Sequence, residues 1–297
     1  MNPASESREA APAASRETPQ GEPVLEIREL RKSLGGKEVL KGVNLTVRKG
    51  EALVVIGGSG CGKSVLLKHI LGLFKPDSGS IHIEGQDITR LHERDLFGVR
   101  QRFGMLFQGA ALFDSMTVAE NVSFALDEHS RKSVSEKREI VEKKLAIVGL
   151  PGVENKYPAE LSGGMKKRVA LARAIAADPD FLLYDEPTTG LDPIMSDVIN
   201  ELIVKLKKSL QVTSIVVTHD MASARKVADR MAMLDGGVIV IHDTPELVFA
   251  SENDVVRRFV EGKALLDQMK EIWGESAGKA QDSENTRRHR RPPPLMT

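Results

Sequence analysis

Residues 51–73, EALVVIGGSGCGKSVLLKHILGL, are the stretch of sequence that decides the fold. The run EALVVI at its start is largely apolar, as is typical of a buried parallel strand. The glycine-rich turn GGSGCGKS follows at 57–64, and we expect the next residues to form a helix. The turn fits the pattern G-x-x-x-x-G-K-[ST], and a strand before it with a helix after it is the structural setting of a P-loop.

The turn has the composition of a phosphate-binding site. Glycines let backbone N–H groups converge on phosphate oxygens without side-chain clashes. Lys63 is expected to reach the β- and γ-phosphates, and Ser64 to ligate Mg²⁺. Cys61 has two interpretations: the backbone contacts need no thiol, yet a helix N-terminus and a nearby lysine both favour a reactive thiolate. The residues expected to contact the nucleotide are Gly57, Gly58, Ser59, Gly60, Cys61, Gly62, Lys63, Ser64 and Val65.

Polar residues also follow two later apolar runs. Asp185 ends the run FLLYD, at the strand end where open α/β sheets place ligands, and is expected to ligate Mg²⁺ directly or through the second shell. Glu186 is then placed to orient and deprotonate an attacking water. His219 ends the next apolar run and is expected to hydrogen-bond a γ-phosphate oxygen. Gln108, in MLFQGAALF, either senses Mg²⁺ and water or faces solvent at a strand end.

Composition limits the classes of protein that this chain can be. It has 297 residues, 41% of them hydrophobic, which is enough for a sizeable core. Lys and Arg together number 42, as do Asp and Glu. The resulting net charge near zero argues against nucleic acid as the main partner, because phosphate neutralisation needs a basic face. A single cysteine excludes an internal disulfide and suits a reducing cytoplasm. No apolar run approaches the ~18–20 residues that span a bilayer.

Strands alternate with helices along the chain, which predicts an α/β fold with a parallel core. The runs VLEIREL and GVNLTVRKG alternate like strands of a partly exposed sheet, and we assign them to an antiparallel β subdomain. The C-terminal helix is expected to pack on its own domain or on a partner subunit, and the tail to be solvated or to contact anionic lipid. The expected parts are a disordered extension (1–23), a nucleotide-binding core (24–94 and 160–250), an inserted helical subdomain (95–159), a C-terminal helix (251–274) and a disordered basic, Pro-rich tail (275–297).

A second candidate anion site lies at LSGGM, where Ser162, Gly163 and Gly164 open an apolar-striped helix. The chain thus carries, in order, the P-loop, Gln108, LSGGM, YDEP, TGLD and His219. In this order of motifs, residues 24–250 resemble the ATP-binding cassette (ABC) ATPases, which have the P-loop NTPase fold.

The resemblance implies an Mg²⁺-dependent ATPase that works as a homodimer. Two copies pair head to tail, and Ser162 and Gly164 of one copy cap the γ-phosphate of the ATP held by the other, with Gly163 also expected to contact the nucleotide. It also places Asp192 in a loop that links the two sites. The sequence departs from the family at Met165, where the signature has Gln, and at Leu34, where many relatives have an aromatic residue stacked on adenine.

Several linking segments resemble the ATPases of Mla/Mce-type phospholipid transporters, notably GMLFQGAALF, the Met of LSGGM, LDEH and NDVVRRFVEG. This resemblance implies two membrane permease subunits, an Mce-domain lipid-binding protein and a peripheral location on the cytoplasmic face of the inner membrane. In the family, a groove receives a cytoplasmic helix of the permease, and we expect Leu112, Phe113 and Met116 to line it.

Two alternatives remain open. The first is the ATPase of an importer for amino acids or other small solutes, which shares most of these motifs. The second is a non-transport ABC protein that acts on DNA or ribosomes. The single cassette, the absence of sustained heptads between Lys63 and Asp185, and the near-zero net charge all weigh against the second alternative.

Overall fold

The structure, a computed structural model, describes residues 21–263. The predictions for 1–20 and 264–297 therefore lie outside the described residues. Within residues 21–263, no helix combines the length and the apolar character needed to cross a membrane.

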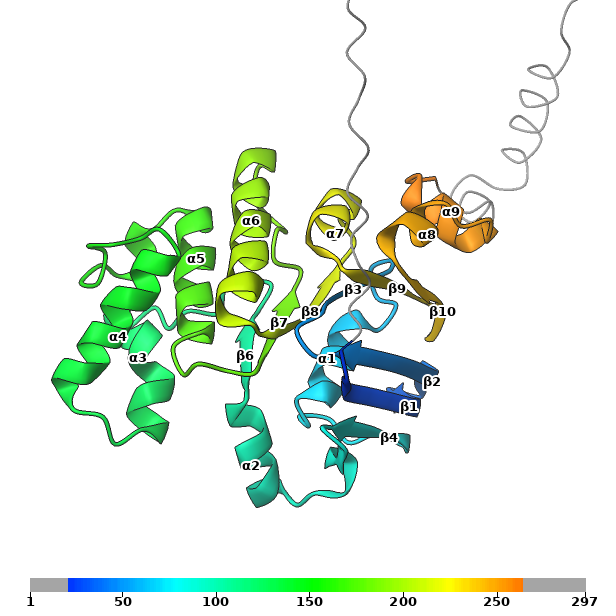
Figure 1. Cartoon of the computed structure of the whole chain (residues 1–297), viewed down its shortest axis with the longest axis horizontal. Coiled ribbons are helices and arrows are strands. Elements are labelled where there is room, and N and C mark those ends of the chain that lie inside the picture. Colours follow the sequence, from blue (N-terminus) through cyan, green and yellow to red (C-terminus); the bar gives the residue numbers. More distant parts are fainter. Residues whose placement is uncertain (1–20, 264–297) are drawn as a thin grey trace, which may run out of the picture.

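A six-stranded sheet forms the core of the fold. Its strands are Ala52–Ile56 (β3), Phe103–Leu106 (β6), Phe181–Asp185 (β7), Thr213–Thr218 (β8), Arg230–Asp235 (β9) and Val238–Asp243 (β10). They lie in the order β10-β9-β3-β8-β7-β6 (Figure 1). The pairs β3–β8, β3–β9, β6–β7 and β7–β8 are parallel, and only the pair β9–β10 is antiparallel among the strands of this sheet. The predicted parallel α/β core is confirmed.

Both faces of this sheet are buried, which explains the continuous apolar run that begins the P-loop segment. Val54 and Ile56 of β3 belong to one core cluster, and Leu53 and Val55 belong to the other. The first cluster includes residues of Gly163–Ala174 (α5), Pro193–Leu210 (α6) and Met221–Val227 (α7), and the second includes residues of Lys63–Ile70 (α1). A strand covered on both sides needs apolar residues at every position, not at alternate ones.

A smaller antiparallel sheet packs on the α1 side of the core. It consists of Pro23–Leu34 (β1), Lys37–Arg48 (β2), Ser78–Ile83 (β4) and Gln86–Asp87 (β5), in the order β2-β1-β4-β5. Leu25, Ile27 and Leu30 point from β1 into the same core cluster as α1. The antiparallel β part predicted from the alternating runs is therefore present, and its first strand begins at Pro23, inside the range expected to be disordered.

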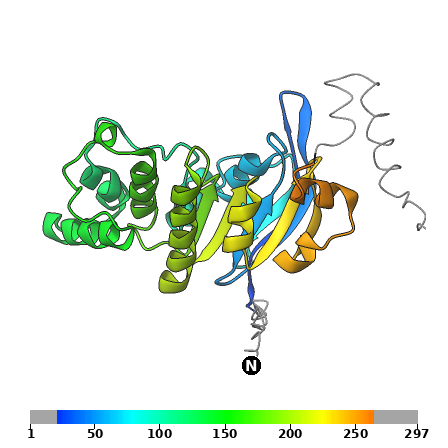
Figure 2. The same ribbon diagram turned by 90° about the horizontal axis from the view of Figure 1, so that it is seen from above.

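The helical part lies at one end of the molecule, away from the C-terminal helices (Figures 1 and 2). Val118–His129 (α3) and Val134–Ile147 (α4) each begin with a capping box, from Thr117 and Ser133 respectively. The short 3-10 helices Ile88–Arg90 (η1) and Pro158–Glu160 (η2) and the helix Glu93–Gln101 (α2) complete the connections.

The structure differs from the predicted helical range 95–159 at its start. The strand β6 falls inside that range, yet it belongs to the core sheet, because its residues pair in register with β7 from Phe103 opposite Phe181 to Leu106 opposite Tyr184. A four-residue strand among charged helical segments gives little periodicity to detect.

The C-terminal helices Pro245–Phe249 (α8) and Asp254–Val260 (α9) pack on the core. Val256 is fully buried, and Val255, Phe259 and Val260 pack beside it against the α5–α7 cluster. The described part of the predicted helix 251–274 therefore packs on its own domain, and it ends at Val260.

Candidate functional site

The P-loop turn connects β3 to α1 and lies against the end of β9. A Cβ atom on Gly57 would lie 2.3 Å from the carbonyl oxygen of Leu234, so only glycine fits this position. The Lys63 Nζ donates hydrogen bonds to the carbonyl oxygens of Gly57 at 2.8 Å and Gly58 at 3.1 Å. The lysine is thus folded back over the turn, above the N-terminus of α1, where backbone N–H groups favour an anion.

A cavity of about 400 Å³ opens above this turn. It gathers Gln108, Glu186 and His219, which the sequence predicted, from segments far apart in the chain. The residues that line it are Val39, Ser59, Gly60, Gly62, Lys63, Ser64, Val65, Gln108, Glu186 and His219.

The apolar wall of this cavity differs from the expectation. Val39 of β2 lines the cavity, whereas Leu34 does not. Leu34 ends β1 at the tip of the hairpin, where it pairs with Lys37 and stays 38% exposed. No local motif marks Val39, because its position depends on how the hairpin folds over the P-loop.

Ser64 lines the cavity, and Asp185 lies behind it, outside the lining residues. The Ser64 hydroxyl donates to the Asp185 Oδ1 at 3.0 Å. Burial raises the pKa of the Asp185 carboxyl above its usual range, the bond from Ser64 opposes that shift, and the neighbouring charge of Glu186 adds to it. Hydroxyl and carboxylate oxygens are the donors that Mg²⁺ prefers, and a divalent cation would offset the charge repulsion between the two acids.

No group of three or more His, Cys, Asp or Glu side chains able to hold a metal occurs within residues 21–263.

Glu186 has a strained backbone, and its carboxylate contacts several other side chains of the site. Its φ is 48°, a left-handed conformation that costs a non-glycine residue about 1–2 kcal/mol. Its carboxylate lies 3.4 Å from the Lys63 Nζ and 2.9 Å from the His219 Nδ1. The hydroxyls of Thr218 and Thr189 donate to it at 3.3 and 3.4 Å. The sequence predicted neither the ion pair with Lys63 nor the two threonine contacts.

Cys61 is half-buried and turned away from the cavity. It packs against the core cluster of the small sheet, and its Sγ lies 2.7 Å from the position of a Cβ on Gly57. Burial raises the pKa of the Cys61 thiol, and the nearby Lys63 only partly opposes the shift. This direction disfavours the interpretation of Cys61 as an activated thiolate, since the desolvation of the thiol outweighs the effect of the lysine.

We expect Cys61 to react with iodoacetamide more slowly at pH 7.5 than a free cysteine does. The thiolate is the reacting species, so the rate should rise with pH up to and beyond the usual thiol pKa. Quenched labelling followed by mass spectrometry measures this, with urea-unfolded protein as the control that restores the ordinary rate. Labelling in the folded protein as fast as in urea would contradict the burial effect.

The second candidate anion site lies apart from the cavity. Ser162 caps α5 by accepting a bond from the Met165 N–H at 3.3 Å, and Asp192 caps α6. The two caps meet side by side: a Cβ on Gly164 would lie 2.5 Å from the Met195 Cε. Ser162, Gly163 and Asp192 are exposed, and none of them lines the cavity, so this surface is separate from the P-loop cavity of its own chain.

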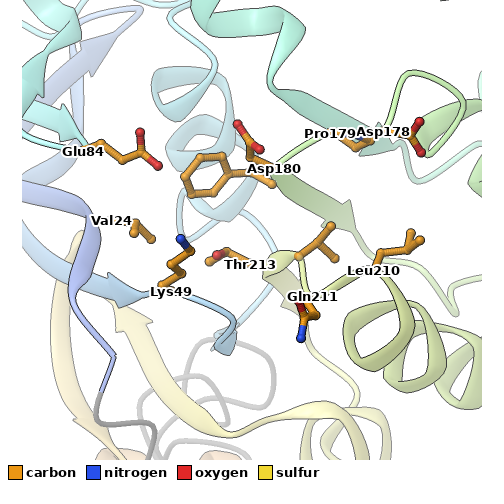
Figure 3. A pocket seen from close by; sticks show the side chains of 11 residues that line it. Val24, Lys49, Glu84, Asp178, Pro179, Asp180, Leu210, Gln211 and Thr213 are labelled. Carbon is orange, nitrogen blue, oxygen red and sulfur yellow. The ribbon is translucent and has the colours of Figure 1, made fainter.

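Another cavity, of about 240 Å³, lies at the opposite edge of the core sheet, where β7 and β8 begin (Figure 3). Its carboxylates are already paired: Glu84 and Asp180 with Arg102, and Asp178 with Lys144. None of the motif residues lines this cavity, so we exclude it as the reaction site.

Known proteins resemble the chain in sequence and in fold. Residues 40–189 match the family model described as ABC transporter. The chain is 44% identical to the probable ribonucleotide transport ATP-binding protein mkl of Mycobacterium tuberculosis, covering 81% of this chain and 67% of that protein. It is 42% identical to the intermembrane phospholipid transport system ATP-binding protein MlaF of Haemophilus influenzae, covering 81% of this chain and 91% of that one.

A methionine import ATP-binding protein, MetN of Brucella abortus, is 39% identical over 84% of this chain and 68% of its own length. Among solved structures, a dimeric post-hydrolysis state of the ATP-binding cassette MJ0796 bound to ADP and Pi is similar, with a TM-score of 0.69 and 33% identity. That match covers 74% of this chain and 98% of the cassette.

Proposed function

This chain belongs to the ATP-binding proteins of the ABC transporter family, and we propose that it drives phospholipid transport in a transporter of the Mla/Mce type. It is an ABC-type ATPase and a transporter subunit. The observation that carries the lipid assignment is the similarity to the phospholipid transport protein MlaF, which extends over 91% of that protein. The similarity to MetN keeps an importer for amino acids or other small solutes as the alternative.

The chemistry that we propose uses the residues around the larger cavity. ATP phosphates bind the P-loop N–H groups and Lys63, which then exchanges its ion pair with Glu186 for the phosphate oxygens. Ser64, Asp185 and Gln108 would hold Mg²⁺, which neutralises charge on the β- and γ-phosphates. Glu186 accepts a proton from the attacking water, and His219 donates to a γ-phosphate oxygen.

Two copies of the chain would complete each site. Ser162 and Gly164 of one copy, with Gly163 between them, would cap the γ-phosphate held by the other, and Asp192 would lie in the loop that links the two sites. In support of this arrangement, the α5 N-terminus is exposed and outside its own chain's cavity, and a similar cassette forms a dimer with ADP and Pi. A two-fold dimer of this kind repeats the same contact twice.

The loop that follows Gln108 supplies the proposed contact with the permease. Phe113 and Phe124 are 42% and 36% exposed, and their ring centroids lie 4.8 Å apart. Fully buried Asn121 fixes this loop: its amide oxygen accepts a bond from the Phe113 N–H, and its NH₂ donates to the carbonyls of Phe113, Met116 and Thr117. An exposed aromatic pair, with Phe113 on the rigid loop and Phe124 on α3, fits an apolar helix of a partner.

Leu112 departs from the predicted groove, since it is half-buried and packs against the core cluster. The exposed side chain beside Phe113 is instead Phe124 of α3, whose ring contacts the Phe113 ring. The complex that we propose contains two copies of this chain, two permease subunits and an Mce-domain lipid-binding protein, with the ATPase subunits peripheral on the cytoplasmic face of the inner membrane.

Phe113→Asp is expected to abolish co-purification with the permease, because a charged side chain would replace an apolar contact. ATP binding and the melting temperature should stay unchanged, since only the exposed ring is altered and the backbone bonds to Asn121 remain. Affinity purification from membranes, followed by mass spectrometry of the recovered proteins, measures this result.

Leu247→Asp is the matched control, because Leu247 is 55% exposed on α8 at the other end of the molecule (Figure 1). Wild-type protein should recover a multi-spanning permease together with an Mce-domain protein. Recovery of an amino-acid permease or of ribosomes would overturn the lipid assignment and leave the ATPase activity untouched.

A further inference from the structure

Lys167 is a buried lysine of α5 for which the proposed chemistry has no use. It is 5% exposed, and its ammonium bonds main-chain carbonyl oxygens and forms no salt bridge within residues 21–263. Burying an ammonium is costly unless hydrogen bonds compensate it. An apolar residue would pack at this position at lower cost. Packing alone therefore does not explain why a charged side chain is buried here.

The two carbonyls that Lys167 contacts belong to two residues of the proposed reaction site. Its Nζ donates a short hydrogen bond to the Gln108 carbonyl and lies 3.5 Å from the Glu186 carbonyl. The side chains of Gln108 and Glu186 both line the larger cavity. They follow β6 and β7, so one ammonium joins the backbones of two separate loops.

Arg173, further along α5, holds the same loop beyond Gln108. Its guanidinium donates to the Ala110 carbonyl at 2.8 Å and to the Ala111 carbonyl at 2.6 Å. Both alanines have left-handed backbones, with φ of 63° and 52°, a conformation that persists only where surrounding contacts hold it. Residues 108–111 are thus tied to α5 at three carbonyls.

We propose that Lys167 is a positioning residue for ATP hydrolysis, which sets the separation between Gln108 and Glu186 by holding both main chains. With the two backbones joined, the Gln108 amide and the Glu186 carboxylate face one reacting water. This inference rests on the roles proposed above for these two residues. Within one subunit the proposed phosphate contacts come from the P-loop and not from α5, so Lys167 affects turnover and not ATP binding to the isolated subunit.

Lys167→Met keeps the length of the side chain and removes the charge and the donors. We expect kcat to fall at least about tenfold while the Kd for ATP is unchanged, because misplacement by about 1 Å can cost on the order of 100-fold. Lys167→Arg, which retains charge and donors, should restore most of the turnover. Lys166→Met is the matched control, since Lys166 precedes Lys167 on α5 and its ammonium makes no hydrogen bond or salt bridge within residues 21–263.

A double-mutant cycle separates positioning from a general structural effect. If Lys167 acts by placing Gln108, then Lys167→Met combined with Gln108→Ala should lower kcat little more than Gln108→Ala alone. Additive losses, or an unchanged kcat in Lys167→Met with the fold intact, would overturn the proposal. If Lys167→Met does not fold, Lys167→Gln, whose amide NH₂ keeps two N–H donors without the charge, is measured in the same cycle against the same outcomes.

Gln108→Ala and Glu186→Gln alone also test the assignment beneath this inference. Full turnover in both variants would show that the reaction site itself is wrongly assigned. Loss of turnover in those two variants, together with wild-type kinetics in Lys167→Met, would reject only the role of Lys167.

Discussion

Glu186→Gln is expected to lower kcat for ATP hydrolysis by about 10²- to 10⁴-fold, the usual loss when a general base is removed. The amide keeps the size of the side chain and can still accept bonds from His219 and Thr218, but it cannot take a proton from water. Phosphate release under single-turnover conditions measures the loss. Near-normal release by the variant would remove Glu186 from the role of base.

The same variant should bind ATP at least as tightly as the wild-type protein. Lys63 lies 3.4 Å from the Glu186 carboxylate, and ATP must break that ion pair to engage the lysine. The amide removes this competition. Since ATP then persists, a dimer should accumulate with MgATP, which size-exclusion chromatography detects. Glu201→Gln, an exposed glutamate of α6 paired only with Lys226 at 2.7 Å, serves as the control and should stay monomeric under the same conditions.

Gly163→Glu is expected to abolish hydrolysis while leaving ATP binding to the isolated subunit intact. Gly163 is exposed, and a Cβ there would meet only the Leu191 Cδ2, at 3.8 Å. A carboxylate at the start of α5 suits that helix N-terminus within one subunit. In the proposed dimer it would instead face the γ-phosphate of the other copy and repel it.

A substitution at Gly163 tests the shared site more cleanly than one at Ser162 or Gly164, because it disturbs the subunit's own structure least. A side chain on Gly164 would collide with Met195, and replacing Ser162 would remove the α5 cap at about 1 kcal/mol. Lys63→Ala is the contrasting variant, because Lys63 belongs to the subunit's own cavity. Titration with a fluorescent ATP analogue should show weakened binding in Lys63→Ala alone. Equal weakening in Gly163→Glu would contradict a site shared between copies.

Residues in contiguous motifs could be predicted from the sequence, whereas contacts between motifs could not. The positions of the P-loop, Asp185 and Glu186 could be predicted, because an apolar run that forms a buried strand directly precedes each of them in the sequence. The ion pair between Lys63 and Glu186 depends on the left-handed backbone at Glu186, which a non-glycine residue gives no reason to expect.

Tertiary packing also decides the remaining differences. From the run MKKR alone, Lys167 would be predicted to be exposed to solvent. In the structure it is buried, because the loops that contain Gln108 and Glu186 pack against it. Cys61 shows the reverse problem: its neighbours in sequence favour a thiolate, while its packing against the small-sheet core favours the thiol. In both cases, residues distant in sequence bury the side chain, and this burial determines its environment more than the neighbouring residues in sequence do.

The four bonds made by the Asn121 side chain have a kinetic consequence for assembly. Because they hold residues 113–117 in one shape in the free subunit, docking need not wait for that loop to order and loses little conformational entropy there. A preformed surface of this kind also moves as one piece. In the proposed complex, a displacement of this loop would therefore be transmitted to the permease, with little of it lost to local rearrangement.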